Sequence, residues 1–185
     1  MEVTTQEIRL TSTGDGDFQW IAGYYNSTYE NRMNSYLHFG PGMVLPDTDF
    51  KLPFELRDEE NTHSAFFGNI SYEMGDWKYD FGVRVDNWEE NEDNLDADTN
   101  GGIHSSKTDD TETLPRLSIT RNLEDGIVYL TSSKGYEPGG LNGSVPYSDA
   151  SGNRLLQPFG IEEAVQHELG LSLIHISEPT RLGMI

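Results

Sequence analysis

The feature that most constrains the fold is a strict alternation of apolar and polar residues in the middle of the chain. From residue 77 to residue 86, apolar side chains occupy every odd position, and polar residues or glycine occupy every even one. A period of two predicts a β-strand with two unlike faces. Residues 66–74 alternate in the same way, and the intervening Gly75-Asp76 predicts a tight hairpin. Because a tight turn preserves the pleat, the apolar residues of both runs should share one face.

Five further runs extend this pattern to about seven strands. Two of them flank Gly14-Asp15-Gly16, two flank Glu124-Asp125-Gly126, and one closes the pattern. The sequence therefore predicts an all-β chain folded as an antiparallel up-and-down meander. The five additional runs are Glu7–Thr11, Phe18–Tyr25, Leu117–Leu123, Val128–Leu130 and Val165–Leu173.

Tight and long connections alternate along the chain. The long ones are expected at about residues 27–61, 88–113 and 137–162, and they are rich in Asp, Glu, Asn, Gly, Ser and Pro. Tight turns at one end and long loops at the other are typical of outer-membrane barrels, whereas a soluble sandwich has no reason to sort its connections. Residues 86–113 hold ten acidic residues and one basic residue, Lys107, which predicts a solvated exterior loop.

Composition leaves two classes of protein open. Lys and Arg total 12 against 32 Asp and Glu, a net charge of -20 that disfavours sequence-blind binding to nucleic acid or anionic lipid surfaces. The absence of cysteine excludes disulfides and thiolate metal sites. Mean hydropathy is -0.61, and no window approaches the roughly 18–20 apolar residues of a membrane helix. Alternating strands of about 9–11 residues can still cross a membrane. The alternatives are a soluble all-β protein and an outer-membrane barrel.

Motifs for catalysis or metal binding are weak. Asp96, Asp98 and Asn100 before Gly101 match the first half of a calcium loop, but its twelfth position is Lys107 instead of a bidentate Glu. This makes them a weak calcium candidate, and an incidental acidic loop is the favoured interpretation. The five histidines have no metal-ligand spacing. No Gly-x-Ser-x-Gly elbow occurs, so nothing supports an enzyme or a cofactor.

The polar positions of the strands would line the lumen if the chain forms part of a barrel. Among them, Arg9, Arg84 and Arg116 are the candidates for contact with a ligand, although internal salt bridging is the simpler role for each one. Trp77 and Tyr79 near a tight turn are expected in an interfacial aromatic girdle, as are Tyr24, Tyr25 and Tyr136 near the long loops. The other expected lumen-facing residues are Glu7, Lys78, Asp80 and Glu168.

Several collinear stretches resemble the barrel of TonB-dependent outer-membrane receptors. The most specific is the Gly-Tyr-x-Pro-Gly-Gly-x-Asn element at residues 135–142. The others are Gln6-Glu7-Ile8-Arg9-Leu10-Thr11-Ser12, Trp20-Ile21-Ala22-Gly23-Tyr24-Tyr25, Ala65-Phe66-Phe67-Gly68, Gly82-Val83-Arg84-Val85-Asp86 and His167-Glu168-Leu169-Gly170.

The resemblance implies a 22-stranded transmembrane barrel with a plug domain, of which residues 1–171 would be an interior piece without the plug. Residues 172–185 resemble a translated sequencing adapter and are expected to be a non-native tail. The implied function is uptake of a scarce ligand, such as a ferric siderophore or a vitamin, at the outer membrane of a Gram-negative-type cell. The implied partners are outer-membrane lipid, the ligand, and TonB acting through the plug; nucleic acid is not among them.

Two other functions or architectures compete with this interpretation. The chain could be a soluble carbohydrate-binding module in which Trp20, Trp77 and Trp88 stack on sugars. It could also be a complete eight-stranded barrel, although the odd strand count and the lack of a natural C-terminal strand disfavour that. Sorting of the connections and the element at residues 135–142 favour the receptor.

Overall fold

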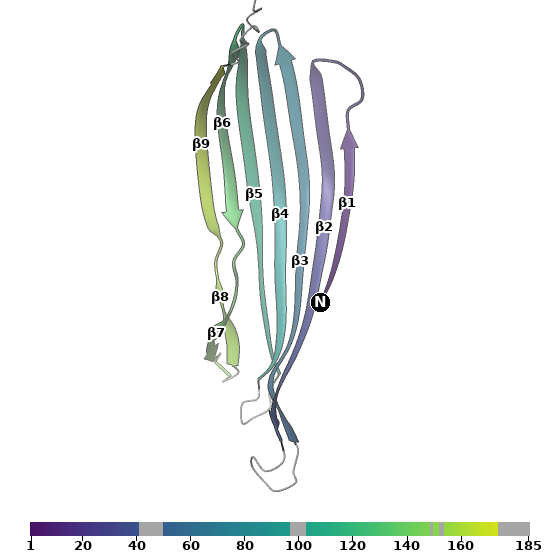
Figure 1. The fold of residues 1–185 in the computed structure, drawn as a ribbon, viewed down its shortest axis with the longest axis vertical. Helices are drawn as coiled ribbons and strands as arrows, with labels where there is room; N and C mark the ends of the chain where they lie inside the picture. The colour runs from purple at the N-terminus through teal and green to yellow at the C-terminus, as the bar shows by residue number, and fades with distance from the viewer. Residues whose placement is uncertain (41–49, 97–102, 149, 152–153, 174–185) are drawn as a thin grey trace, which may run out of the picture.

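The computed structural model describes residues 1–40, 50–96, 103–148, 150–151 and 154–173. Seven strands form one antiparallel sheet in the order β1-β2-β3-β4-β5-β6-β9, which confirms the predicted meander (Figure 1). A separate two-stranded hairpin, β7-β8, lies between β6 and β9 in the chain. The strands of the sheet are β1 (Glu2–Thr11), β2 (Phe18–Phe39), β3 (Phe50–Met74), β4 (Trp77–Asp96), β5 (Ile103–Leu123), β6 (Gly126–Glu137) and β9 (Glu162–Leu173), and those of the hairpin are β7 (Gly140–Ser148) and β8 (Arg154–Phe159).

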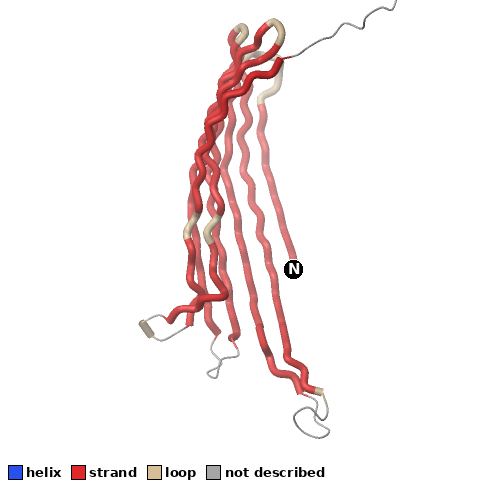
Figure 2. The backbone as a smooth tube through the Cα atoms, turned by 60° about the vertical axis from the view of Figure 1, so that its left-hand side comes forward, coloured by secondary structure: helices blue, strands red, loops and turns tan. Residues whose placement is uncertain are grey.

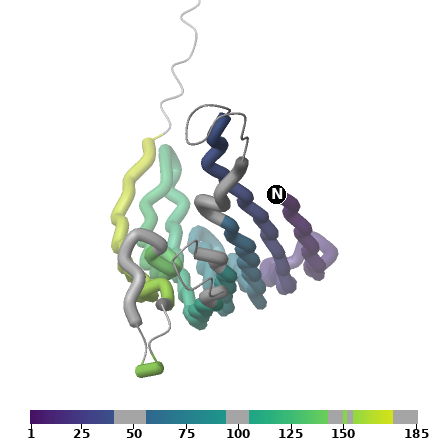
Figure 3. Tube along the Cα trace, turned by 90° about the horizontal axis from the view of Figure 1, so that it is seen from below, coloured from purple at the N-terminus to yellow at the C-terminus, as the bar shows by residue number. Residues whose placement is uncertain are grey.

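The sheet is one layer thick and curves into a trough. Figure 2 shows the single layer of strands, of which β2 to β5 run nearly the whole length of the sheet, and Figure 3 shows their arc when the sheet is seen end-on. The three tight turns lie together at one end of the sheet, as the sequence predicts (Figure 1). Gly75 in the β3-β4 turn has a φ of 59°, a left-handed conformation that glycine adopts at little cost.

Strand register confirms that the predicted apolar residues share one face. Phe66, Ile70 and Tyr72 of β3 lie directly opposite Val85, Phe81 and Tyr79 of β4, and directly opposed residues of an antiparallel pair point to the same side. We call this side the apolar face and the other side the polar face. Each of the two faces continues across the neighbouring strands, because Phe81 also opposes Leu117 of β5.

The prediction that residues 27–61 and 88–113 are long loops is wrong. Most of these residues extend β2, β3, β4 and β5. Residue 40 is the one described residue that remains between β2 and β3, and the segments 41–49 and 97–102 are not described. With 25 residues, β3 alone spans about 80 Å at roughly 3.3 Å per residue. Polar side chains occupy both faces of these extensions, so the alternation that identifies a strand in sequence is absent.

Cross-strand polar contacts support the ladder in the polar extensions. Arg32 on β2 donates two hydrogen bonds to Asp58 on β3, at 2.7 and 2.9 Å. The Lys107 ammonium lies 2.9 Å from Glu89, so much of the expected acidic loop is in fact a paired β-hairpin. Residues 137–162 were likewise expected as a loop, but they contain the hairpin β7-β8.

Almost no hydrophobic core exists in the described part of the chain. Ala65 and Leu156 are its only buried hydrophobic residues, whereas Phe66, Phe81 and Leu169 are 63%, 50% and 77% exposed. A single-layer sheet has no second layer to cover its apolar side. The apolar face is therefore unpartnered within the part of the chain that the structure describes.

No helix among the described residues has the length and apolar character needed to cross a membrane.

Gly23 is predicted to be required where β1, β2 and β3 pass one another. A Cβ at this position would lie 2.7 Å from the Ile8 carbonyl oxygen and would also collide with the Phe67 ring. Gly23→Ala should lower the free energy of unfolding by about 1–3 kcal/mol, because the Ile8 carbonyl oxygen belongs to the paired backbone of β1 and can move away only by disturbing that pairing.

The matched control is Gly68→Ala on β3, where the added Cβ would lie 3.5 Å from the nearest atom, the Ile21 carbonyl oxygen. A denaturant titration of the folded protein measures both variants. Equal losses of stability in the two variants would contradict the close approach at Gly23.

Candidate functional site

The polar face carries the three arginines singled out from the sequence. Arg9 opposes Gly23, Gly23 opposes Phe67, and Phe67 opposes Arg84, so these residues form one row across β1 to β4. Arg116 on β5 opposes Gly82, two residues before Arg84, and so shares their face. The register therefore brings Arg9, Arg84 and Arg116 to one side of the sheet.

A cluster centred on Asp86 lies next to this row, two residues beyond Arg84 on β4 and farther from the tight turns. The Arg84 Nε donates a hydrogen bond of 2.6 Å to Asp86 Oδ1, and His63 Nε2 lies 3.3 Å from the same oxygen. The Asp86 side chain is 4% exposed, and a buried carboxylate of this kind needs a partner such as the Arg84 guanidinium beside it. The Arg84 side chain is 34% exposed, so the cluster does not enclose it fully.

Two tyrosines expected in the interfacial girdle belong to this cluster instead. The Arg84 guanidinium lies 5.5 Å from the centre of the Tyr25 ring, and the Tyr136 hydroxyl hydrogen-bonds Asp86. The expectation for Tyr25 and Tyr136 is therefore wrong. Tyr25 lies on the polar face by register, and Tyr136 reaches Asp86 beyond the point where the β5-β6 pairing ends. Tyr24 lies on the apolar face, where it contacts Phe66 at a centroid distance of 4.8 Å.

The other two candidate arginines have different surroundings. Arg9 makes an ion pair with Glu7 on the same strand. Arg116 makes no ion pair with any residue in the described parts of the chain. Of the three candidates, Arg116 is thus the cation that a ligand could reach without displacing an internal carboxylate.

Two further ion clusters lie near the end with the long connections. Lys134 bridges Glu112 and Glu163, with its ammonium 2.7 Å from each carboxylate. By strict alternation from Leu130, Lys134 belongs on the apolar face, but the β5-β6 pairing ends at Ser133 and the ammonium reaches Glu112 on the polar face. Farther along, Arg57 lies 2.7 Å from the buried Glu92. Sequence reasoning missed both clusters because their members come from different strands.

The base of the β7-β8 hairpin is fastened to the polar face by two side chains. The Leu141 N–H donates to Glu90 Oε2 on β4 at 3.2 Å, and the Leu156 N–H donates to Ser106 Oγ on β5 at 2.9 Å. Glu90 is 7% exposed and Leu156 is 6% exposed. The β7-β8 hairpin, which connects β6 to β9 in the chain, therefore lies against β4 and β5.

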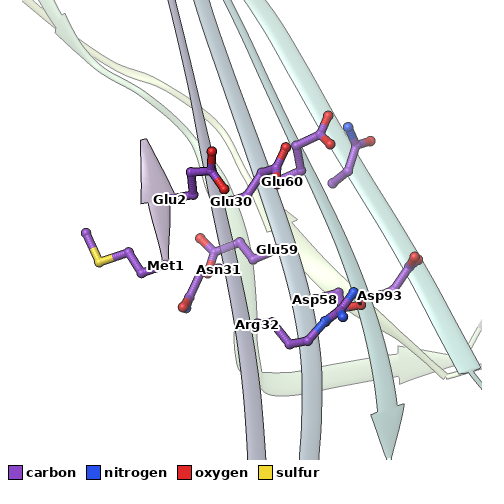
Figure 4. Close-up of a pocket in the computed structure, with 10 residues that line it drawn as sticks. Met1, Glu2, Glu30, Asn31, Arg32, Asp58, Glu59, Glu60 and Asp93 are labelled. Atoms are coloured by element: carbon purple, nitrogen blue, oxygen red, sulfur yellow. Dashed lines mark hydrogen bonds and ion pairs between the residues drawn. The ribbon is translucent and has the colours of Figure 1, made fainter. Parts of the chain in front are cut away.

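A cavity of about 540 Å³ opens where β1 begins beside β2 and β3 (Figure 4). Its lining is mostly acidic, and Arg32 is its one basic side chain, pointing toward Asp58 in the figure. Such a lining repels anions. Within the described residues, no group of three or more His, Asp or Glu side chains is placed to hold a metal ion. The carboxylates of the lining belong to Glu2, Glu30, Asp58, Glu59, Glu60 and Asp93.

The weak calcium candidate falls largely outside the description. Asp98 and Asn100 lie in the segment that is not described, and Asp96 is the last residue of β4. Of the expected tail, Ser172 and Leu173 pair with β6, and residues 174–185 lie outside the described residues.

The three tryptophans do not form one platform. Trp20 opposes Ile70, and Trp77 opposes Met74, so both lie on the apolar face. Trp88 opposes His63 and lies on the polar face, several residues farther along β4. A sugar cannot stack on all three.

Comparisons with known proteins agree with this architecture. The family described as TonB dependent receptor-like, beta-barrel matches residues 3–181. The ferric yersiniabactin uptake receptor FyuA from Yersinia pestis is similar in structure, with a TM-score of 0.63 and 22% sequence identity. The similarity covers 93% of this chain and 26% of that receptor, so the chain spans about a quarter of its length. None of the curated proteins compared with the chain matches it.

Glu90 provides a pH-dependent test of the hairpin contact. Burial raises the pKa of its carboxyl above the ordinary 4.5, and the nearby Glu59 raises it further, against the opposing effects of the Leu141 N–H and Arg57. Because the folded pKa lies above the unfolded one, the charged form opposes docking. The contact should therefore be strongest below about pH 4.5 and weaken as the pH rises through the folded value.

Glu90→Gln keeps an oxygen that can accept the Leu141 N–H and removes the charge. We expect slower hydrogen exchange at the Leu141 amide at neutral pH, and an exchange protection that no longer varies with pH near the folded pKa of Glu90. The control is Glu89→Gln, on the opposite face of β4. Protection that falls in Glu90→Gln would contradict the proposed cost of the buried charge.

Proposed function

Because this chain belongs to the TonB-dependent receptor β-barrel family, we propose that it forms strands of an outer-membrane receptor that imports a scarce ligand such as a ferric siderophore or a vitamin. The observation that carries the proposal is the pair of unlike faces on a one-layer sheet. Apolar side chains such as Phe66 and Phe81 are exposed on one side, and Arg84 and Asp86 are held on the other. Lipid would cover the first side and a polar lumen would face the second.

The apolar face is too extensive for a soluble monomer. It runs from Ile8 and Leu10 on β1 to Leu169 and Leu171 on β9, and these residues are 62–77% exposed. Soluble monomers rarely expose contiguous apolar patches larger than a few hundred Å². A lipid environment removes this surface from water without a second layer of protein. The carbohydrate-binding alternative offers no cover for this face and divides its three tryptophans between the two faces.

We propose further that residues 1–171 are an interior part of a 22-stranded barrel whose plug domain lies outside this sequence, with residues 172–185 a non-native tail. The edge strands β1 and β9 each lack a second neighbour in this sheet. In hydrocarbon, every unpaired backbone group costs several kcal/mol, so adjoining strands of the complete barrel would have to satisfy them.

Transport in this proposal depends on the polar face. A ferric siderophore that carries negative charge would enter from the end with the long connections and meet Arg84 and Arg116. TonB would supply energy through the plug, which would rearrange inside the barrel to release the ligand. The chain's own contribution is a polar wall on which Tyr25 and Asp86 hold the Arg84 cation in a defined place.

Placing a charge on the apolar face tests membrane insertion. Phe81→Arg should destabilise the receptor in bilayers by about 2–4 kcal/mol, because the guanidinium would be buried in hydrocarbon. Ser71→Arg is the control, since Ser71 opposes Asp80 on the polar face and the new charge would meet a carboxylate. Urea titration of the reconstituted receptor measures both. Equal stability of the two variants would mean that the apolar face does not meet lipid.

Growth under iron limitation tests the transport function. A receptor gene carrying this segment, placed in a strain without siderophore receptors of its own, should restore growth on at least one compound from a panel of ferric catecholates, ferric hydroxamates and ferric phenolates. Deleting TonB should abolish that growth. Cobalamin uptake measured in parallel separates a vitamin receptor from an iron receptor, and growth that persists without TonB would contradict energy-coupled transport.

Arg116 is expected to contribute to binding of an anionic ligand. Arg116→Gln should raise the ligand's Kd by about tenfold, the loss of one charge-assisted hydrogen bond. Arg9→Gln is the matched control, because Arg9 already pairs with Glu7 and should change the Kd little. Titration of the purified receptor with the ferric ligand measures both constants. A larger effect at Arg9 than at Arg116 would contradict this assignment.

A further inference from the structure

A single cation interrupts the apolar face near the tight turns. Arg121 on β5 opposes Trp77 on β4 and Val128 on β6, which places it on the same side as Ile119 and Leu117. Among the described residues in the cross-strand rows through Trp77, Tyr79, Phe81 and Val83, it is the one Asp, Glu, Lys or Arg on this face. A charge at such a position is costly in hydrocarbon and needs a partner.

Arg121 is held by an aromatic ring instead of a carboxylate. Its guanidinium carbon lies 5.2 Å from the centre of the Trp77 ring, and Trp77 stacks on Tyr79 at 6.4 Å. No described carboxylate forms an ion pair with it, in contrast to Arg9, Arg32 and Arg84. The ring contact fixes the position of the guanidinium and leaves its planar N–H donors able to bind an anion.

Arg121 also lies at the level where headgroups would be found. The Asn122 N–H bonds the Asp76 carbonyl oxygen at 2.7 Å, so the β4-β5 ladder ends one residue beyond Arg121. In outer-membrane barrels, tight turns of this kind lie on the periplasmic side. Arg121 would then meet the inner leaflet, with the exposed Leu123 beside it at the boundary.

We propose that Arg121, stacked on Trp77, binds the phosphate of an anionic glycerophospholipid in the inner leaflet. The inference rests on the membrane location proposed above. A guanidinium can donate two parallel hydrogen bonds to a phosphate from its planar fork, a geometry that an ammonium group does not offer. A lipid without a compensating amine keeps its full negative charge for Arg121, so phosphatidylglycerol is favoured over phosphatidylcholine.

The main concentration of negative charge in this chain, which has a net charge of -20, lies far from this site. Ten of the acidic residues lie between Asp86 and Glu112, at the other end of the strands. Even Asp86, which of these residues on β4 is the nearest to Trp77, lies nine residues from it along the strand, roughly 30 Å at about 3.3 Å per residue. That exceeds the Debye length of about 8 Å at physiological ionic strength, so these charges are largely screened from Arg121.

The test uses the complete receptor that carries this segment, purified in a neutral detergent. Short-chain phosphatidylglycerol is titrated in, and the lipid-bound forms are counted by native mass spectrometry. Arg121→Gln should raise the Kd of the tightest-binding lipid about fivefold, the usual contribution of one basic residue near an anionic headgroup. Trp77→Leu should also weaken binding, since the guanidinium then loses its fixed position.

Arg116→Gln is the matched control, because Arg116 lies five residues away on the same strand but on the polar face. It should leave lipid binding unchanged. An unchanged Kd in Arg121→Gln, an equal loss in Arg116→Gln, equal binding of phosphatidylcholine by the unaltered receptor, or preferential binding of lipid A at Arg121 would each overturn the proposal.

Ligand uptake measured on the same variants separates this proposal from the transport function. Arg121→Gln should transport the ferric ligand normally while it loses the lipid preference. Normal uptake with unchanged lipid binding would overturn the lipid site alone. A receptor that imports no ligand but depends on Arg121 for phosphatidylglycerol would support the lipid site and contradict the proposed transport.

Discussion

Hydrogen bonding between neighbouring strand backbones is the interaction on which the rest of the structure depends. The sheet is one layer thick, and Ala65 and Leu156 are the only hydrophobic residues buried in its described part, so packing between layers contributes little. Continuous pairing over strands as long as β3 fixes which residues oppose one another. Both faces, the Asp86 cluster and the row of arginines follow from that register. In the proposed membrane, the same pairing also satisfies the hydrogen bonds of the internal peptide groups within the hydrocarbon.

The extent to which the sequence predicts this fold depends on what surrounds each strand. Between Phe66 and Val85 the two faces meet different environments, so the alternation is strict and the hairpin is predicted correctly. Beyond Asp86, polar side chains occupy both faces, and nothing in the sequence distinguishes a paired strand from a solvated loop. The extensions of β2 to β5 were missed for that reason. Their strand structure is maintained by continuation of the ladder, with contacts such as Arg32 to Asp58 added along it.

The sequence predicts which face of the sheet carries the candidate site, but not the contacts within the site. Parity along a strand is sufficient to place Arg9, Arg84 and Arg116 on one side. It cannot show that His63 and Tyr136, which are far from Asp86 in sequence, converge on its carboxylate. Nor can it show that Lys134 departs from alternation, because that depends on where the β5-β6 pairing ends. The hairpin contact at Glu90 joins residues 51 positions apart, and only the folded register reveals it.

The unpartnered apolar face has a consequence for how such a protein can change during evolution. In a packed core, shortening a side chain leaves a void whose walls lose their contacts, and this adds to the cost of the lost transfer energy. Acyl chains are fluid and would fill the space left by a shorter residue at Leu169 or Phe81. Only the transfer term would then remain, and many apolar residues become interchangeable at each position. A sheet of this kind can retain its shape while its sequence diverges, as the 22% identity at a TM-score of 0.63 illustrates.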